Sequence, residues 1–96
     1  MDLMLSDYIT STPGICGGKP CIRGRRIRVQ DVAIFSEEMQ QNPDQIAQEF
    51  DLTLAQVHAA LAYYFEHIDA IRAEIRRERE EFVRLKAENP SKLGSA

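Results

Sequence analysis

The pattern of apolar positions along the chain changes at residue 30. Before it, two short extended segments, residues 8–10 and 26–29, flank turns rich in glycine and proline. From residue 30 onward, apolar side chains recur every three or four positions, which is the period of an amphipathic helix. We therefore expect a mainly α protein with a short N-terminal β-hairpin or strand pair.

Three helices are expected between residues 30 and 66, with recognisable signals at their ends. Asn42 caps a short second helix that begins at Pro43, and Thr53 caps a third. The tight turn at Asp51 and Leu52 makes this pair a helix-turn-helix, in which aspartate takes the left-handed position usually given to glycine. The apolar stripe expected in the first helix is Val32, Ala33, Phe35 and Met39, and that of the third includes Leu54, Val57, Leu61, Tyr64 and Phe65.

The apolar pattern continues into a C-terminal amphipathic helix that stops by Asn89 and Pro90. The sequence leaves open whether this helix runs straight on from the third or breaks near His67. We divide the chain into a helix-turn-helix domain, residues 1–68, and a C-terminal helix with a frayed polar tail, residues 69–96. We call the apolar a/d positions that run from the third helix into this one the seam, which the glutamate interrupts once. The seam comprises Leu61, Tyr64, Ile68, Ile71, Ile75, Glu78, Phe82 and Leu85.

Length and composition narrow the class of protein. A chain of 96 residues forms a single domain with a modest core and often relies on oligomerisation, so the unpartnered seam and the aromatic cluster at residues 63–65 predict a homodimer. No apolar run approaches the roughly 20 residues that span a bilayer, and no leader is visible, so we expect a cytoplasmic protein without a membrane partner.

Two features argue against metal binding and catalysis. Cys16 and Cys21 are expected to be free thiols, and with only His58 and His67 as further candidates they make an incomplete zinc ligand set. Neither histidine has a visible serine or cysteine partner for nucleophilic work. We therefore expect no enzymatic activity, no metal and no cofactor.

Charge is sharply segregated although the net charge is only −3. Residues 30–71 hold eight acidic side chains and no lysine or arginine, so the helical body would repel a DNA duplex. If DNA is bound, most phosphate contacts must come from the preceding basic loop, and the third helix offers only Gln56 and His58 to read bases. The basic loop carries Lys19, Arg23, Arg25, Arg26 and Arg28.

Two stretches of the chain resemble a known family. Residues 13–27 read PGICGGKPCIRGRRI, with Ile9 and Thr10 before them and Val29 after. Residues 46–64 place Ile46, Ala47, Phe50, Leu52, Thr53 and Val57 before the run AALAYY. Together these residues resemble the signature and the helix-turn-helix of domain-of-unknown-function family 433 (DUF433), over about residues 8–68. The resemblance implies a homeodomain-like fold, often dimeric, and members are regarded as VapB-type antitoxins of a PIN-like nuclease of domain-of-unknown-function family 5615.

This resemblance implies an antitoxin of a type II toxin–antitoxin system, which binds and neutralises its nuclease through the C-terminal helix. An arginine of that helix can pair with the carboxylates that hold divalent metal in such nucleases. The competing explanation is that these arginines pair within the helix, Arg76 with Glu80 and Arg77 with Glu81. Whether operator DNA is also bound stays open, and the alternative function is a stand-alone DNA-binding regulator or scaffold with no toxin. The candidate partner-binding residues are Arg72, Arg76, Arg77, Arg79, Phe82, Arg84 and Leu85.

Overall fold

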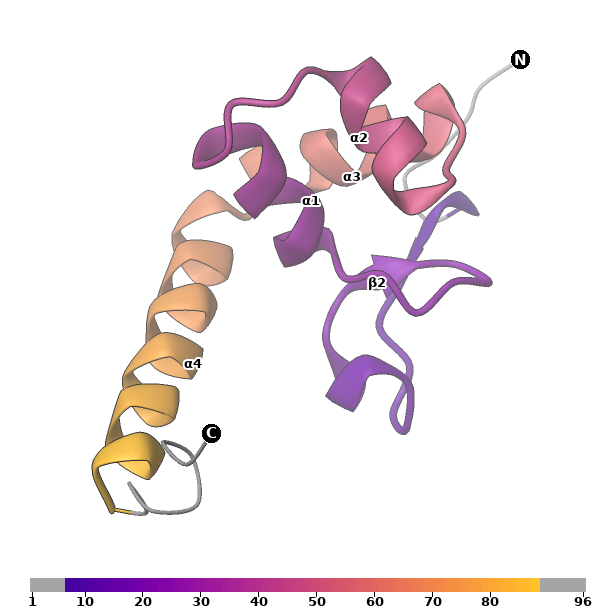
Figure 1. The fold of residues 1–96 in the computed structure, drawn as a ribbon. Coiled ribbons are helices and arrows are strands. Elements are labelled where there is room, and N and C mark those ends of the chain that lie inside the picture. The colour runs from indigo at the N-terminus through magenta and orange to yellow at the C-terminus, as the bar shows by residue number, and fades with distance from the viewer. Residues whose placement is uncertain (1–6, 89–96) are drawn as a thin grey trace.

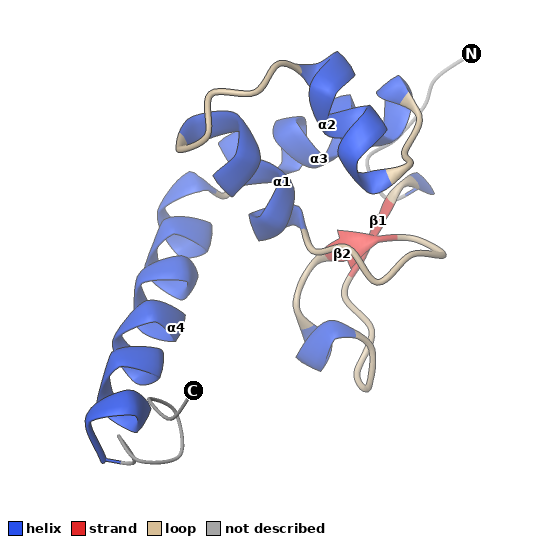
Figure 2. Cartoon of the chain, viewed as in Figure 1, coloured by secondary structure: helices blue, strands red, loops and turns tan. Residues whose placement is uncertain are grey.

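A computed structural model describes residues 7–88 of the protein. Helices dominate it, and the sheet consists of two very short strands (Figure 2), so the expected mainly α class is confirmed. The predicted C-terminal stop and polar tail, from Asn89 on, lie outside the described residues. The elements in chain order are β1 (Ile9–Thr10), a 3₁₀ turn η2 (Cys16–Gly18), β2 (Cys21–Ile22), α1 (Val29–Glu37), α2 (Pro43–Phe50), α3 (Leu54–Glu66) and α4 (Ile68–Glu88).

The strand pair forms, but its second strand is not the predicted one. β1 pairs antiparallel with β2, with Ile9 opposite Ile22, whereas residues 26–29 keep only an isolated bridge to Cys21. A turn with Gly24 at φ +80° folds the chain back, so that the amide of Ile22 donates to the Ile27 carbonyl at 2.9 Å. Cys21 and Ile22 thus lie between β1 on one side and residues 27–28 on the other, and both are fully buried.

The signals that bound α2 and α3 act as predicted. The Asn42 side chain accepts a hydrogen bond from the Gln45 amide at 2.9 Å, and the Thr53 hydroxyl accepts from the Gln56 amide at 3.1 Å. The side-chain oxygen of each glutamine accepts a hydrogen bond from the backbone amide of its cap residue, which completes two capping boxes. Asp51 ends α2 in the left-handed conformation, at φ 55° and ψ 52°. The helix-turn-helix is therefore closed by local bonds.

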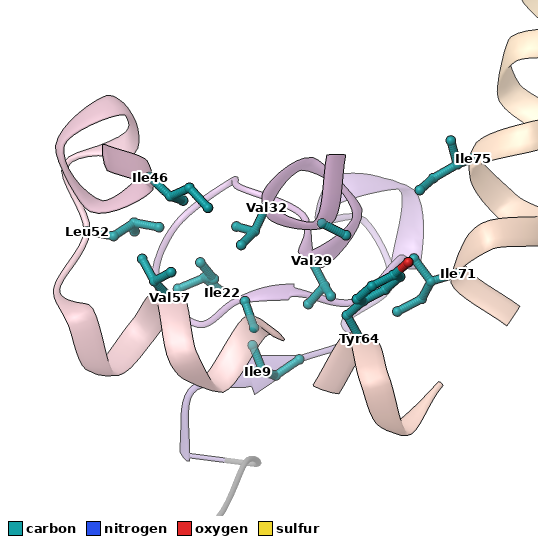
Figure 3. Packing of buried hydrophobic residues seen from close by; sticks show 12 residues of the cluster. Ile9, Ile22, Val29, Val32, Ile46, Leu52, Val57, Tyr64, Ile71 and Ile75 are labelled. Atoms are coloured by element: carbon teal, nitrogen blue, oxygen red, sulfur yellow. The ribbon is translucent and has the colours of Figure 1, made fainter. Parts of the chain in front are cut away.

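The core lies where α1, α2 and α3 meet the small sheet (Figure 3). Three residues assigned to the apolar stripes of the first and third helices were placed wrongly, because Met39 is 53%, Leu54 46% and Phe65 57% exposed. Met39 lies beyond the end of α1, and Leu54 is the first residue of α3. Figure 3 shows the main core side chains from these elements, namely Ile9, Ile22, Val29, Val32, Ile46, Leu52, Val57 and Tyr64, beside Ile71 and Ile75 of α4.

Helix α4 is separate from α3 and leaves the body of the molecule (Figure 1). His67, at φ −130° and ψ 37°, breaks the helix, which settles the question left open by the sequence. Ile75 is its last buried residue, and every residue from 79 to 88 is exposed. We call residues 79–88 the overhang, which at 1.5 Å per residue extends about 15 Å. Within residues 7–88, none of the helices combines the length and apolarity needed to cross a membrane.

The left-handed conformation of Asp51 predicts how substitutions at this position change the stability of the fold. We expect Asp51→Gly to stabilise the fold by up to about 0.5–1 kcal/mol, because glycine adopts positive φ without strain, and Asp51→Val to destabilise it by about 1–2 kcal/mol. Urea unfolding of both variants measures this, with Asp51→Asn as the control for loss of charge. Equal stability of the glycine and valine variants would show that the turn relaxes to another conformation.

Candidate nucleic-acid and partner-binding surfaces

Arg25 fixes the basic loop beside the turn of the helix-turn-helix. Its guanidinium donates hydrogen bonds to the carbonyl oxygens of Asp51 at 2.7 Å and Phe50 at 2.9 Å. These carbonyls end α2, where the helix dipole favours a cation. The loop therefore lies next to the start of α3, as a DNA-binding surface would require, but the side chain of Arg25 is engaged in the fold itself.

Lys19 and Arg28 point instead toward carboxylates of α4. The ammonium of Lys19 pairs with Glu74 at 3.0 Å and also with Glu78, and a guanidinium nitrogen of Arg28 lies 3.1 Å from the Glu78 carboxylate. The side-chain NH₂ group of Gln30 donates to the same carboxylate at 2.7 Å. We call these five residues the Glu78 cluster. Two of the five cations of the basic loop are thus neutralised within the protein.

The electrostatics of the Glu78 cluster favour a permanently ionised carboxylate. Burial alone would raise the pKa of Glu78, but hydrogen bonds from Lys19, Gln30 and Arg28 outweigh burial and lower that pKa to about 2. Arg28 is also held by Asp31, with nitrogen and oxygen 3.0 Å apart. At neutral pH the cluster is a network of full charges.

The remaining candidates for DNA contact lie on the surface. Arg23 and Arg26 are exposed at the loop, and His58 is exposed on α3. The side-chain oxygen of Gln56 accepts from the Thr53 amide at 2.9 Å, so its capping role leaves only its NH₂ group for a base. The structure therefore brings part of the basic loop to the helix-turn-helix and takes the rest to α4.

Two arginines predicted to bind a partner connect α4 to the body instead. Arg72 donates to the Tyr64 hydroxyl at 2.9 Å, and Arg79 pairs at 2.9 Å with Glu38, the C-cap residue of α1. Both bonds cross from α4 to another helix, so these side chains position α4. Both guanidinium groups are therefore already bonded within the chain.

The intrahelical pairs expected along α4 form differently. Arg77 pairs with Glu74, three residues before it, and Arg84 lies 4.0 Å from Glu81, the outer limit of an ion pair. Arg76 has no carboxylate partner within residues 7–88. The expected pairs, Arg76 with Glu80 and Arg77 with Glu81, were therefore wrong.

A groove of about 720 Å³ runs between α1 and α4. Its apolar lining includes Ala33, Ile34, Ile75, Val83 and Ala87, and four arginines also line it, namely Arg72, Arg76, Arg79 and Arg84. Phe82 and Leu85 are not part of this groove, and are 60% and 43% exposed. The predicted partner-binding residues therefore occupy more than one side of α4.

The aromatic cluster offers less interface than the sequence indicated. Tyr64 is buried in the core, and Tyr63 stacks on His67 with ring centroids 4.2 Å apart. Only Phe65 among the three is strongly exposed, at 57%. The predicted homodimer thus has one aromatic residue available here, and it stays a prediction.

The two cysteines are free thiols, with Cys21 buried and Cys16 half-buried. Burial, reinforced by a hydrogen bond with Cys16, raises the pKa of the Cys21 thiol, so it is a poor nucleophile and metal ligand. Among residues 7–88, no three histidine, cysteine, aspartate or glutamate side chains gather as a metal site would need.

Sequence reasoning missed Gln30, Glu74 and Glu38 as contacts of the loop and of α4. A usable signal was nevertheless present, because Glu78 interrupts an otherwise apolar seam. A charged residue in such a position needs a partner when it packs against a body. The partner, however, could not be identified without the fold.

The profile of a family described as "Protein of unknown function (DUF433)" matches residues 9–64, which end before α4. No curated protein matches the chain. The crystal structure of a DUF433 member protein from Anabaena variabilis ATCC 29413 is 35% identical, with a TM-score of 0.61 over 76% of this chain and 72% of that chain.

Neighbouring arginines of the basic loop should differ in their effect on folding. We expect Arg25→Ala to lower the free energy of unfolding by about 1–2 kcal/mol, because two carbonyls at the end of α2 lose their donor. Arg26→Ala, which changes an exposed residue, should stay within about 0.5 kcal/mol of the unaltered chain. Urea denaturation measures both, and an equal loss would show that the bonds of Arg25 contribute nothing.

The depressed pKa of Glu78 predicts a pH-dependent stability. The ionised group contributes fully above its unfolded pKa of about 4.5 and loses its contribution as pH falls toward the folded pKa of about 2. At pH 7 we expect Glu78→Gln to cost about 1–2 kcal/mol, a figure reduced for solvent screening because the carboxylate is 35% exposed. The cost should shrink between pH 4.5 and 2.

Thermal unfolding of both chains across this pH range is the measurement, and Glu80→Gln is the control. Glu80 lies on the same helix, is exposed and has no ion pair within residues 7–88. A cost for Glu78→Gln that is independent of pH would assign the effect to packing rather than charge.

Proposed function

The chain belongs to the family of proteins of unknown function DUF433, and from this premise we propose that it is the antitoxin of a type II toxin–antitoxin pair. It binds and neutralises a PIN-like nuclease through α4. The observation that supports this most is the overhang, the end of a helix that leaves the body of the molecule (Figure 1), in which all ten residues are exposed. The catalytic work belongs to the partner, and this chain acts as its inhibitor.

The apolar side chains of the overhang supply the binding free energy. Phe82, Val83 and Leu85 are 60%, 64% and 43% exposed, although they are large and close together in sequence. Burying such a side chain fully against a partner is worth about 1.5–3 kcal/mol relative to leaving it in water. Their concentration on one helix end favours a protein-binding site over a merely solvated surface.

An arginine of the overhang supplies the inhibition. Arg84 is 65% exposed at its side chain and has only a marginal ion pair, so its guanidinium is available to a partner. The planar fork of arginine matches a carboxylate bidentately. Inserted among the carboxylates that hold a divalent ion in the nuclease, it would compete with that ion and block metal-assisted hydrolysis. Arg72 and Arg79 are less suited, because they hold α4 to the body.

A second role at operator DNA is favoured by one specific contact. Arg25 holds the basic loop against the end of α2, so the exposed Arg23 and Arg26 lie near the turn that precedes α3. Phosphate contacts from the loop would then orient α3 toward base edges, with Gln56 and His58 as the available readers. The chain would act there as a homodimer, for which the exposed Phe65 offers apolar surface.

The antitoxin proposal predicts that the exposed apolar residues of α4 carry nuclease binding. We expect Phe82→Ala combined with Leu85→Ala to weaken binding to the nuclease encoded by the adjacent gene about a hundredfold, because both anchors are lost. Lys86→Ala combined with Glu88→Ala is the control, since it changes two exposed residues of the same overhang. Titration calorimetry gives the affinity, and ribonuclease assays give the inhibition. Undiminished binding and inhibition by the apolar variant would refute the proposed interface.

A further inference from the structure

Three donors from the N-terminal half of the chain converge on a single oxyanion. Lys19 follows η2, Arg28 caps the N-terminus of α1, and Gln30 lies in its first turn. Arg28 lies 3.1 Å from one oxygen of the Glu78 carboxylate, and Gln30 donates to the other at 2.7 Å. Two oxygens of a phosphodiester present the same kind of acceptor pair. The donors therefore form an oxyanion site, filled by a carboxylate of the same chain.

The donors are arranged to hold an anion whether or not Glu78 supplies it. Gln30 is only 6% exposed, and its NH₂ group faces the site, so an acceptor must be present there. The N-terminus of α1 adds the positive end of a helix dipole. The site thus keeps its demand for an oxyanion when the carboxylate withdraws.

An anion can reach the site from solvent. A hollow of about 300 Å³ is lined by Lys19, Gln30 and Glu74, and a second of about 460 Å³ is lined by Arg28, Gln30 and Glu78. The side chains of Lys19 and Arg28 are 26% and 29% exposed. The site is therefore an accessible recess at the surface.

We propose that Lys19, Arg28 and Gln30 form a binding site for a backbone phosphate of DNA, and that Glu78, assisted by Glu74, closes it by occupying the donors. While it is closed, the two glutamates cancel the charges of Lys19 and Arg28, and the site does not attract phosphate. Once it opens, a phosphate bound there would add to the contacts that the exposed Arg23 and Arg26 can make. This inference rests on the proposed DNA role and is independent of the nuclease.

The test compares two variants with the same net charge. Glu74→Gln combined with Glu78→Gln opens the site, whereas Glu80→Gln combined with Glu88→Gln removes two exposed charges of the same helix without touching it. Fluorescence anisotropy with a labelled mixed-sequence DNA duplex is recorded at several salt concentrations. The open variant should bind about tenfold more tightly than the control at low salt, with a salt slope steeper by about one unit, because Arg28 stays paired with Asp31. Equal binding, or no binding by either, overturns the proposal.

Lys19→Gln provides an independent arm. In the open variant it should abolish most of the gain, whereas in the unaltered chain it should change DNA affinity by less than about twofold, because Lys19 is already engaged. A large loss in the unaltered chain would mean that the site is not closed.

Should the open variant fail to fold by circular dichroism, the single variant Glu78→Gln decides the matter, with Glu80→Gln as its control of equal net charge. Glu78→Gln removes one of the two closing charges and leaves Lys19 paired with Glu74, so it must bind DNA more tightly than the control, but with a smaller gain than that expected of the open variant. No gain overturns the proposal. Nuclease binding is measured separately with the unaltered chain, and its absence there would count against the antitoxin role alone.

Discussion

The carboxylate of Glu78 joins three parts of the protein that are far apart in sequence. It lies on α4 and is held by Lys19 from the N-terminal loop and by Arg28 and Gln30 from the start of α1. The apolar packing of α4 ends at Ile75, so the helix beyond it is held by polar contacts, namely those of Glu78 and the pair of Arg79 with Glu38. The Glu78 contact decides which cations of the basic loop remain available to a nucleic acid. The surfaces proposed for a partner and for DNA thus meet at one side chain.

The sequence predicted best those features that are fixed by neighbours in the chain. The caps at Asn42 and Thr53 and the left-handed Asp51 follow from bonds that span a few residues, and all of them form as expected. The partner of β1 was misassigned because the glycine and proline turns were taken to separate it from residues 26–29, whereas β1 pairs with Cys21 and Ile22, which are fully buried. Choosing between adjacent segments requires knowing which one the helices cover.

The residues of the candidate sites could be predicted from the sequence, but the way in which the fold arranges them could not. Five cations close in sequence indicated one basic patch, yet the fold sends Arg25 to the end of α2, and Lys19 and Arg28 to α4. These contacts join residues tens of positions apart, which no local pattern encodes. The interruption of the apolar seam by Glu78 marked α4 as unusual and left its partner unspecified.

The central claim is that Glu78 and the N-terminal cations interact directly and hold α4 in place. A double-mutant cycle between Arg28→Gln and Glu78→Gln, read by urea denaturation at pH 7, measures that interaction free energy. A coupling of at least about 1 kcal/mol is expected, and a parallel cycle between Arg28→Gln and Glu80→Gln should show additivity within about 0.5 kcal/mol. Additive effects in the first cycle would contradict the account, because α4 would then be held by its apolar contacts and by the bonds of Arg72 and Arg79, without a contribution from Glu78.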